Sequence, residues 1–68
     1  MDVATLADLL HETSEHHGPY EASAPKHNWW DWYAAYASAR QGGASPDAAD
    51  AIADRYMAEV KGVVATRG

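Results

Sequence analysis

Histidine and carboxylate side chains are concentrated in the first half of the chain, and these residue types are suited to holding a metal ion. Imidazole nitrogens and carboxylate oxygens are ligands that zinc, iron and manganese accept in proteins. His11 and Glu15 are four residues apart, so one helix face can present both side chains, and Glu12 and His16 have the same spacing. The candidate metal ligands are therefore His11, Glu15, His16 and His17.

The alternative interpretation is that these histidines are exposed helix residues, with His17 packed beside Tyr20. The sequence contains neither H-E-x-x-H nor a repeated E-x-x-H, the spacings that mark metal sites on helices. A histidine beside a carboxylate can also transfer protons. However, the chain has no cysteine, no G-x-S-x-G motif and no glycine-rich phosphate loop. The sequence therefore favours a non-enzymatic role and predicts neither catalytic residues nor a cofactor.

A run of aromatic residues between Asn28 and Gln41 offers a different kind of site. It contains all three tryptophans and two of the four tyrosines of the chain. Placed on a helix at about 100° per residue, these rings and Arg40 share one arc of about 160°. Tryptophan and tyrosine are enriched at binding hot spots, and their rings can also receive a flat or cationic ligand. The candidate ligand-binding or partner-binding residues are Trp29, Trp30, Trp32, Tyr33, Tyr36, Arg40 and Tyr20.

The competing interpretation of the aromatic run is that its rings form the core, because aromatic stripes at helical spacing usually do. Arg40 would then extend to solvent from the end of the helix. Otherwise its guanidinium would stack on a ring or pair with a carboxylate. Trp30 and Trp32 lie at the two edges of the arc, so we expect them to be the most exposed of the rings.

Local signals predict that the aromatic run is a helix over residues 29–41. Asn28 suits the N-cap position, and Asp31 stands where a capping box places its acidic partner. Gly42 and Gly43 follow the last periodic residue, as is typical of a helix end.

A first helix is predicted over residues 3–17, capped by Asp2 or Thr5. Gly18 and Pro19 should interrupt it, because proline lacks the backbone N–H of the helical ladder. Residues 19–24 should then form either a short helical turn of their own or a kinked continuation of the first helix. The apolar stripe that this helix should bury consists of Val3, Leu6, Leu9, Leu10 and Thr13.

A third helix is predicted over residues 46–65, with Ser45 as its N-cap and Pro46 as its first residue. Gly62 should weaken its last turns, and residues 66–68 should fray. Its predicted apolar stripe consists of Ala49, Ile52, Ala53, Tyr56, Val60, Val63 and Val64.

Length and composition predict a single all-α domain over residues 1–68, folded as a compact three-helix bundle. The chain is rich in alanine and poor in β-branched residues, which favours helices. Its net charge of −5 argues against nucleic acid and anionic membrane surfaces as partners. The sequence shows neither a secretory signal nor a membrane span, so a cytoplasmic location is expected.

Two runs of the sequence resemble a known helical segment. The run from His17 to Glu21 reads H-G-P-Y-E, and the run from Trp29 to Tyr36 reads W-W-D-W-Y-A-A-Y. Together they resemble a segment near the carboxyl end of actinobacterial glyoxalase/bleomycin-resistance-type proteins, of the form H-x-x-Y-E, a short spacer, then W-x-D-W-Y-A-x-Y. The resemblance covers most of the chain. It implies a small helical module that is appended to another domain or stands alone, with the signature residues Tyr20, Glu21, Asp31, Trp32 and Tyr33.

The resemblance implies no activity for this chain. The metal-binding, vicinal-oxygen-chelate part of those proteins is a β-rich module, and this sequence contains no such module. No catalytic or metal-binding residue is therefore carried over. Glu21 and Asp31 are expected to have structural roles, either as helix caps or as hydrogen-bond partners of Trp and Tyr side chains.

These observations lead to three hypotheses. The first is a non-enzymatic helical module that uses the aromatic face from Trp29 to Tyr36 to bind a protein partner or a second copy of itself. The second is a protein that binds or sequesters a drug-like or aromatic small molecule. The third is a metal-binding bundle built on the His- and Glu-rich first half.

Overall fold

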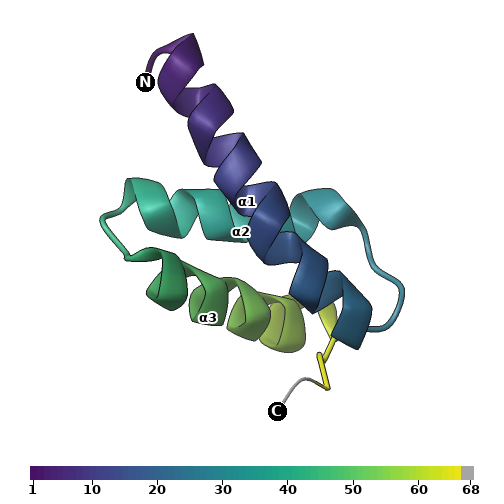
Figure 1. Cartoon of the computed structure of the whole chain (residues 1–68). Coiled ribbons are helices and arrows are strands. Elements are labelled where there is room, and N and C mark those ends of the chain that lie inside the picture. Colours follow the sequence, from purple (N-terminus) through teal and green to yellow (C-terminus); the bar gives the residue numbers. More distant parts are fainter. Residues whose placement is uncertain (67–68) are drawn as a thin grey trace.

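Three helices form the fold in the computed structural model, in which residues 1–66 are described. Helix α2 and helix α3 lie side by side and antiparallel, and α1 crosses them (Figure 1). This arrangement confirms the predicted all-α three-helix bundle. The helices are α1 (Val3–Ser23), α2 (Trp29–Gln41) and α3 (Pro46–Tyr56), and α3 continues into the π-helical turn η1 (Met57–Lys61).

Helix α1 runs through Pro19 without a break, so the predicted end near residue 17 was wrong, and of the two alternatives for residues 19–24 a continuation of α1 is the one observed. Proline removes one backbone hydrogen bond from the ladder. The next residue, Tyr20, is fully buried and fixes this part of the helix in the core. The Ser23 hydroxyl also donates to the Pro19 carbonyl at 2.9 Å. At the other end, the Asp2 carboxylate accepts from the Thr5 amide at 2.9 Å and provides the expected N-cap.

Helix α2 has the predicted bounds, but its first turn is not capped as expected. The Asn28 side chain makes no capping hydrogen bond. Its backbone carbonyl instead accepts from the Asp31 amide at 3.3 Å. The Asp31 carboxylate lies 3.7 Å from the Lys61 ammonium, so it links α2 to η1 rather than closing a capping box.

Helix α3 begins as predicted but ends before residue 65. The Ser45 hydroxyl accepts from the Ala48 amide at 3.2 Å, with Pro46 as the first helical residue. After the π-helical turn, Gly62 adopts a left-handed conformation with φ of 69°. Glycine adopts this conformation without the steric cost of a side chain, so it ends the helix rather than merely weakening it.

The core consists of three large rings from α1 and α2 packed against small side chains of α3. Trp32 stacks on Tyr20 with a centroid distance of 5.6 Å and on Tyr36 with a centroid distance of 5.3 Å. Ala49 and Ala53 are fully buried and let the backbone of α3 approach these rings. Met57 completes the buried apolar set.

The predicted apolar stripes are buried only in part. The first turns of α1 project beyond α2 (Figure 1), and there Val3 is 85% exposed while Leu6 and Leu10 are also exposed. Thr13 is the stripe residue of α1 that is fully buried. On the third helical segment and beyond it, the exposed stripe residues are Ile52, Tyr56, Val60 and Val64.

The segment after η1 returns to the end of α1. The backbone N–H and the hydroxyl of Thr66 donate to the Ser23 carbonyl at 2.8 Å and 3.0 Å. The prediction that the chain frays from residue 66 was therefore wrong for Thr66, and residues 67–68 lie outside the described part. No helix within residues 1–66 is long and apolar enough to span a membrane.

Candidate functional site

Trp32 is a core residue, so the prediction that it would be exposed was wrong. Its side chain is 0% exposed, and its indole N–H donates to the Asp54 carboxylate of α3 at 3.0 Å. The edge of the aromatic arc that holds Trp32 faces α3, and the helix covers it completely. Tyr20 and Tyr36 are buried beside it, so three of the seven candidate binding residues are part of the core.

The other edge of the arc is open to solvent. Trp29 is 55% exposed and Trp30 is 53% exposed, which confirms the prediction for Trp30. Their rings meet edge to face at 5.6 Å, and Trp29 meets half-buried Tyr33 in the same way at 5.0 Å. We call Trp29, Trp30 and Tyr33 the aromatic edge. It is a continuous set of rings at the start of α2, attached to the core through Tyr33.

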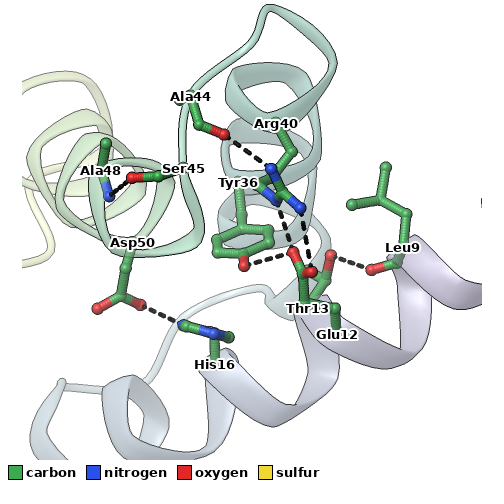
Figure 2. Close-up of polar contacts among 10 residues, drawn as sticks. All are labelled: Leu9, Glu12, Thr13, His16, Tyr36, Arg40, Ala44, Ser45, Ala48 and Asp50. Atoms are coloured by element: carbon green, nitrogen blue, oxygen red, sulfur yellow. Dashed lines mark hydrogen bonds and ion pairs between the residues drawn. The ribbon is translucent and has the colours of Figure 1, made fainter.

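Arg40 and Tyr36 are both bound to one carboxylate of α1. The Glu12 carboxylate accepts from the Tyr36 hydroxyl at 2.6 Å and from the Arg40 guanidinium at 2.8 and 3.3 Å (Figure 2). The guanidinium also donates to the Ala44 carbonyl at 2.9 Å. Of the alternatives weighed for Arg40, pairing with a carboxylate is the one observed.

The charges in this network favour its paired form. Hydrogen bonds from Arg40 and then Tyr36 hold the pKa of Glu12 below its usual value. Burial, followed by the hydrogen bond to Glu12, raises the pKa of Tyr36 well above its usual value, so the hydroxyl remains a donor. The hydrogen bond to Glu12 likewise raises the pKa of Arg40. The side chains of Glu12, Tyr36 and Arg40 are hydrogen-bonded to one another, so the network joins α1 to α2.

Two histidines meet beside the aromatic core. His17, which is 5% exposed, comes from α1, and half-buried His27 comes from the connection to α2. Their Nε2 atoms are 3.1 Å apart. The other ring nitrogens also face polar groups: Nδ1 of His17 lies 3.5 Å from the Glu21 carboxylate, and Nδ1 of His27 lies 2.9 Å from the Pro25 carbonyl.

The surroundings of His17 are mostly aromatic. Its ring centroid lies 5.4 Å from that of Trp32, 5.2 Å from that of Tyr33 and 6.1 Å from that of Tyr20. Burial lowers the pKa of His17, against the smaller opposing effect of Glu21. The neutral imidazole is therefore favoured in the folded chain.

The structure separates the four predicted metal ligands into different pairs. His11 and Glu15 face each other at 3.7 Å on the exposed side of α1. His16 lies 3.6 Å from Asp50 of α3 (Figure 2), while His17 is paired with His27. Among residues 1–66, no group of three or more His, Cys, Asp and Glu side chains is placed to hold a metal ion.

A groove of about 500 Å³ lies between α2 and α3. Small side chains of α2 form one wall, and Ile52 and Tyr56 form the other. The tryptophans of α2 do not line it. The aromatic rings that were predicted to receive a ligand therefore do not enclose this groove.

Three residues at the site were not anticipated as partners. Glu12 joins Arg40 and Tyr36, Asp54 holds the Trp32 indole, and His27 meets His17. Each contact joins residues at least ten positions apart, so helical spacing does not reveal it. For the His17–His27 contact, the sequence gives one indication, which is that the first half of the chain contains four histidines including His27.

No family model, no curated protein and no solved structure matches the chain.

Proposed function

We propose that the chain is a non-enzymatic helical module that binds protein through the aromatic edge, and that its partner is a second copy of the chain. The observation that supports this proposal is the exposure of Trp29 and Trp30, each more than half open to solvent. Large aromatic side chains dominate the energy of protein interfaces. Two adjacent exposed tryptophans are costly to leave in water in a chain with so small a core.

The distribution of charge favours a second copy at this place. The chain carries ten acidic residues, and like charges oppose self-association over most of its surface. The segment between Glu21 and Asp31 contains no acidic residue, and Lys26 is its one lysine or arginine. Two copies related by a two-fold axis can therefore bring their aromatic edges together with little repulsion.

The size of the aromatic edge predicts a weak complex. Each exposed tryptophan can contribute only part of the roughly 150–250 Å² that a large aromatic side chain buries. A stable interface buries about 800 Å² on each partner. We therefore expect a reversible dimer with a dissociation constant of about 10 µM or weaker.

Two further considerations support protein binding. The motif residues resemble a segment that is appended to vicinal-oxygen-chelate proteins, and an appended segment needs a surface for the domain beside it. Small-molecule sequestration by the same face would require a cavity among its rings. Tyr20, Trp32 and Tyr36 instead stack directly on one another, which fills that space.

The test is sedimentation velocity on the untagged chain over about a hundredfold range of concentration, because association must respond to concentration by mass action. Wild type should shift from monomer to dimer. The double variant Trp29→Ala/Trp30→Ala should remain monomeric, while the control Ile52→Ala, which truncates an exposed apolar side chain on α3, should dimerise like wild type. A monomeric wild type, or a dimer that the double variant preserves, would overturn the proposal.

A further inference from the structure

The pair formed by His17 and His27 is not explained by protein binding or by the core. Histidines from two different elements converge so that their Nε2 atoms are 3.1 Å apart. The rings meet nearly edge to face, with centroids 5.3 Å apart and an interplanar angle of 72°. Two neutral ring nitrogens can share one hydrogen, or both can present lone pairs to a third atom.

The groups behind the two rings favour a lone pair on each Nε2. The Pro25 carbonyl can only accept a hydrogen bond, so Nδ1 of His27 carries the hydrogen and Nε2 carries the lone pair. The Glu21 carboxylate, 3.5 Å from Nδ1 of His17, favours the same tautomer for that ring. A carboxylate or a backbone carbonyl behind each imidazole is the usual outer shell of histidine metal ligands.

We propose that His17 and His27 form a two-histidine site for a divalent transition-metal ion of the nickel and zinc class. This site does not depend on the proposed dimer. It differs from the predicted set of His11, Glu15, His16 and His17, because His27 takes the place of three of those residues.

The distance between the two nitrogens fits such an ion. Zinc–nitrogen bonds of about 2.05 Å to both Nε2 atoms would subtend about 98° at the metal. An ideal tetrahedral angle would need a separation of about 3.3 Å, so the nitrogens would move apart by only about 0.2 Å. The chain offers two ligands, and water occupies the remaining positions of the ion.

Access to the pair exists on the side of His27. A hollow of about 230 Å³ is lined by Glu21, Ala24, Pro25, Lys26 and His27. The hollow therefore reaches both His27 and Glu21, the carboxylate beside His17. Bound water on the ion can extend into this hollow, while the aromatic rings around His17 close the opposite side.

The test is titration of the metal-free, untagged chain with Ni²⁺, followed by isothermal calorimetry. Nickel binds imidazole more strongly than manganese, iron or cobalt, so it is a sensitive probe of a site with two nitrogens. Wild type should bind one ion per chain with saturation. The variant His27→Ala should bind at least about tenfold more weakly, since it loses one of the two ligands.

The matched control is His11→Ala, which removes an exposed histidine of α1 that lies outside the pair. It should bind Ni²⁺ like wild type. If His27→Ala fails to fold by circular dichroism, His27→Gln preserves more of the side-chain volume and takes its place. No saturable binding to wild type, or equal affinity in the folded His27 variant, would overturn the proposal.

A second readout separates this site from a merely structural role of His27. In an NMR spectrum of the ¹⁵N-labelled chain, Ni²⁺ should broaden the ring signals of His17 and His27 before those of His11 and His16. Broadening that begins at His11 or His16 would contradict the proposal. Because the dimer is measured by sedimentation and the ion by calorimetry, either proposal can fail without the other.

Discussion

Trp32 and Trp30 are two residues apart on the same helix, yet they belong to different parts of the molecule. Trp32 lies between Tyr20 and Tyr36 and donates its indole N–H to Asp54. Trp30 is more than half exposed and touches Trp29. The difference shows that direction around the helix, rather than residue type, decides whether an aromatic side chain holds the fold together or is available to a partner.

The largest effect should come from truncating the buried ring. Trp32→Ala should lower the free energy of unfolding by about 3–5 kcal/mol, because it leaves a cavity in the core and removes the indole N–H that donates to the Asp54 carboxylate. A chain of this size has a total stability of about 3–10 kcal/mol, so the variant should be partly or fully unfolded. Urea unfolding followed by circular dichroism measures the change. A Trp32→Ala variant as stable as wild type would erase the contrast with Trp30.

The next effect should come from the polar link between the helices. Tyr36→Phe keeps the buried ring but removes the hydroxyl that donates to Glu12, so it should cost about 1–2 kcal/mol. The same urea titration measures it. Tyr33→Phe provides the comparison, since Tyr33 lies at the aromatic edge. If both variants lose the same stability, the Glu12 hydrogen bond is not the cause.

The buried region should also make stability depend on pH. The pKa of His17 is lowered from 6.5 by burial, so the unfolded chain binds more protons just below that pH, and the free energy of unfolding should fall as the solution is acidified. The pKa of Glu12 is lowered from 4.5 by Arg40 and Tyr36, and its contribution should be lost further into acid. Thermal unfolding measured between pH 8 and 3 would record both losses of stability. The first should begin as the pH falls below the ordinary His17 pKa of 6.5, and the second as it falls below the ordinary Glu12 pKa of 4.5. A His17→Gln variant should lack the first loss of stability. If the loss persists in this variant, a group other than His17 causes it.

The smallest effect on stability should come from the aromatic edge. Trp29→Ala and Trp30→Ala should each change the free energy of unfolding by no more than about 0.5 kcal/mol, as is usual for exposed positions. Their measurement is urea unfolding at a concentration where the chain is monomeric. A loss comparable to that of Trp32→Ala would mean that these rings support the fold, and the contrast would disappear.

Features set by neighbouring residues could be predicted from the sequence. The start of α3 is an example, because Ser45 and Pro46 act within one helical turn. The bounds of α2 follow from equally local patterns. The fold class follows from three such helices joined by short connections.

Features set by tertiary contacts could not be predicted in this way. Pro19 is a strong local signal for a break, but burial of Tyr20 outweighs it. The aromatic arc has two edges, and nothing in its spacing says that α3 would cover the one with Trp32. The meeting of His17 with His27 depends on how the connection between α1 and α2 returns to the core.

Because the first turns of α1 project beyond α2, the two ends of this helix should differ in how readily they open. Helices shorter than about 12–15 residues are marginal in water, so residues 3–10 remain helical mainly because the rest of α1 is docked. Amide hydrogen exchange should therefore slow along the helix, from rapid near Val3 to protection set by global unfolding near Tyr20. The docked part of α1 then keeps its first turns helical, and these turns can open and close without global unfolding of the protein.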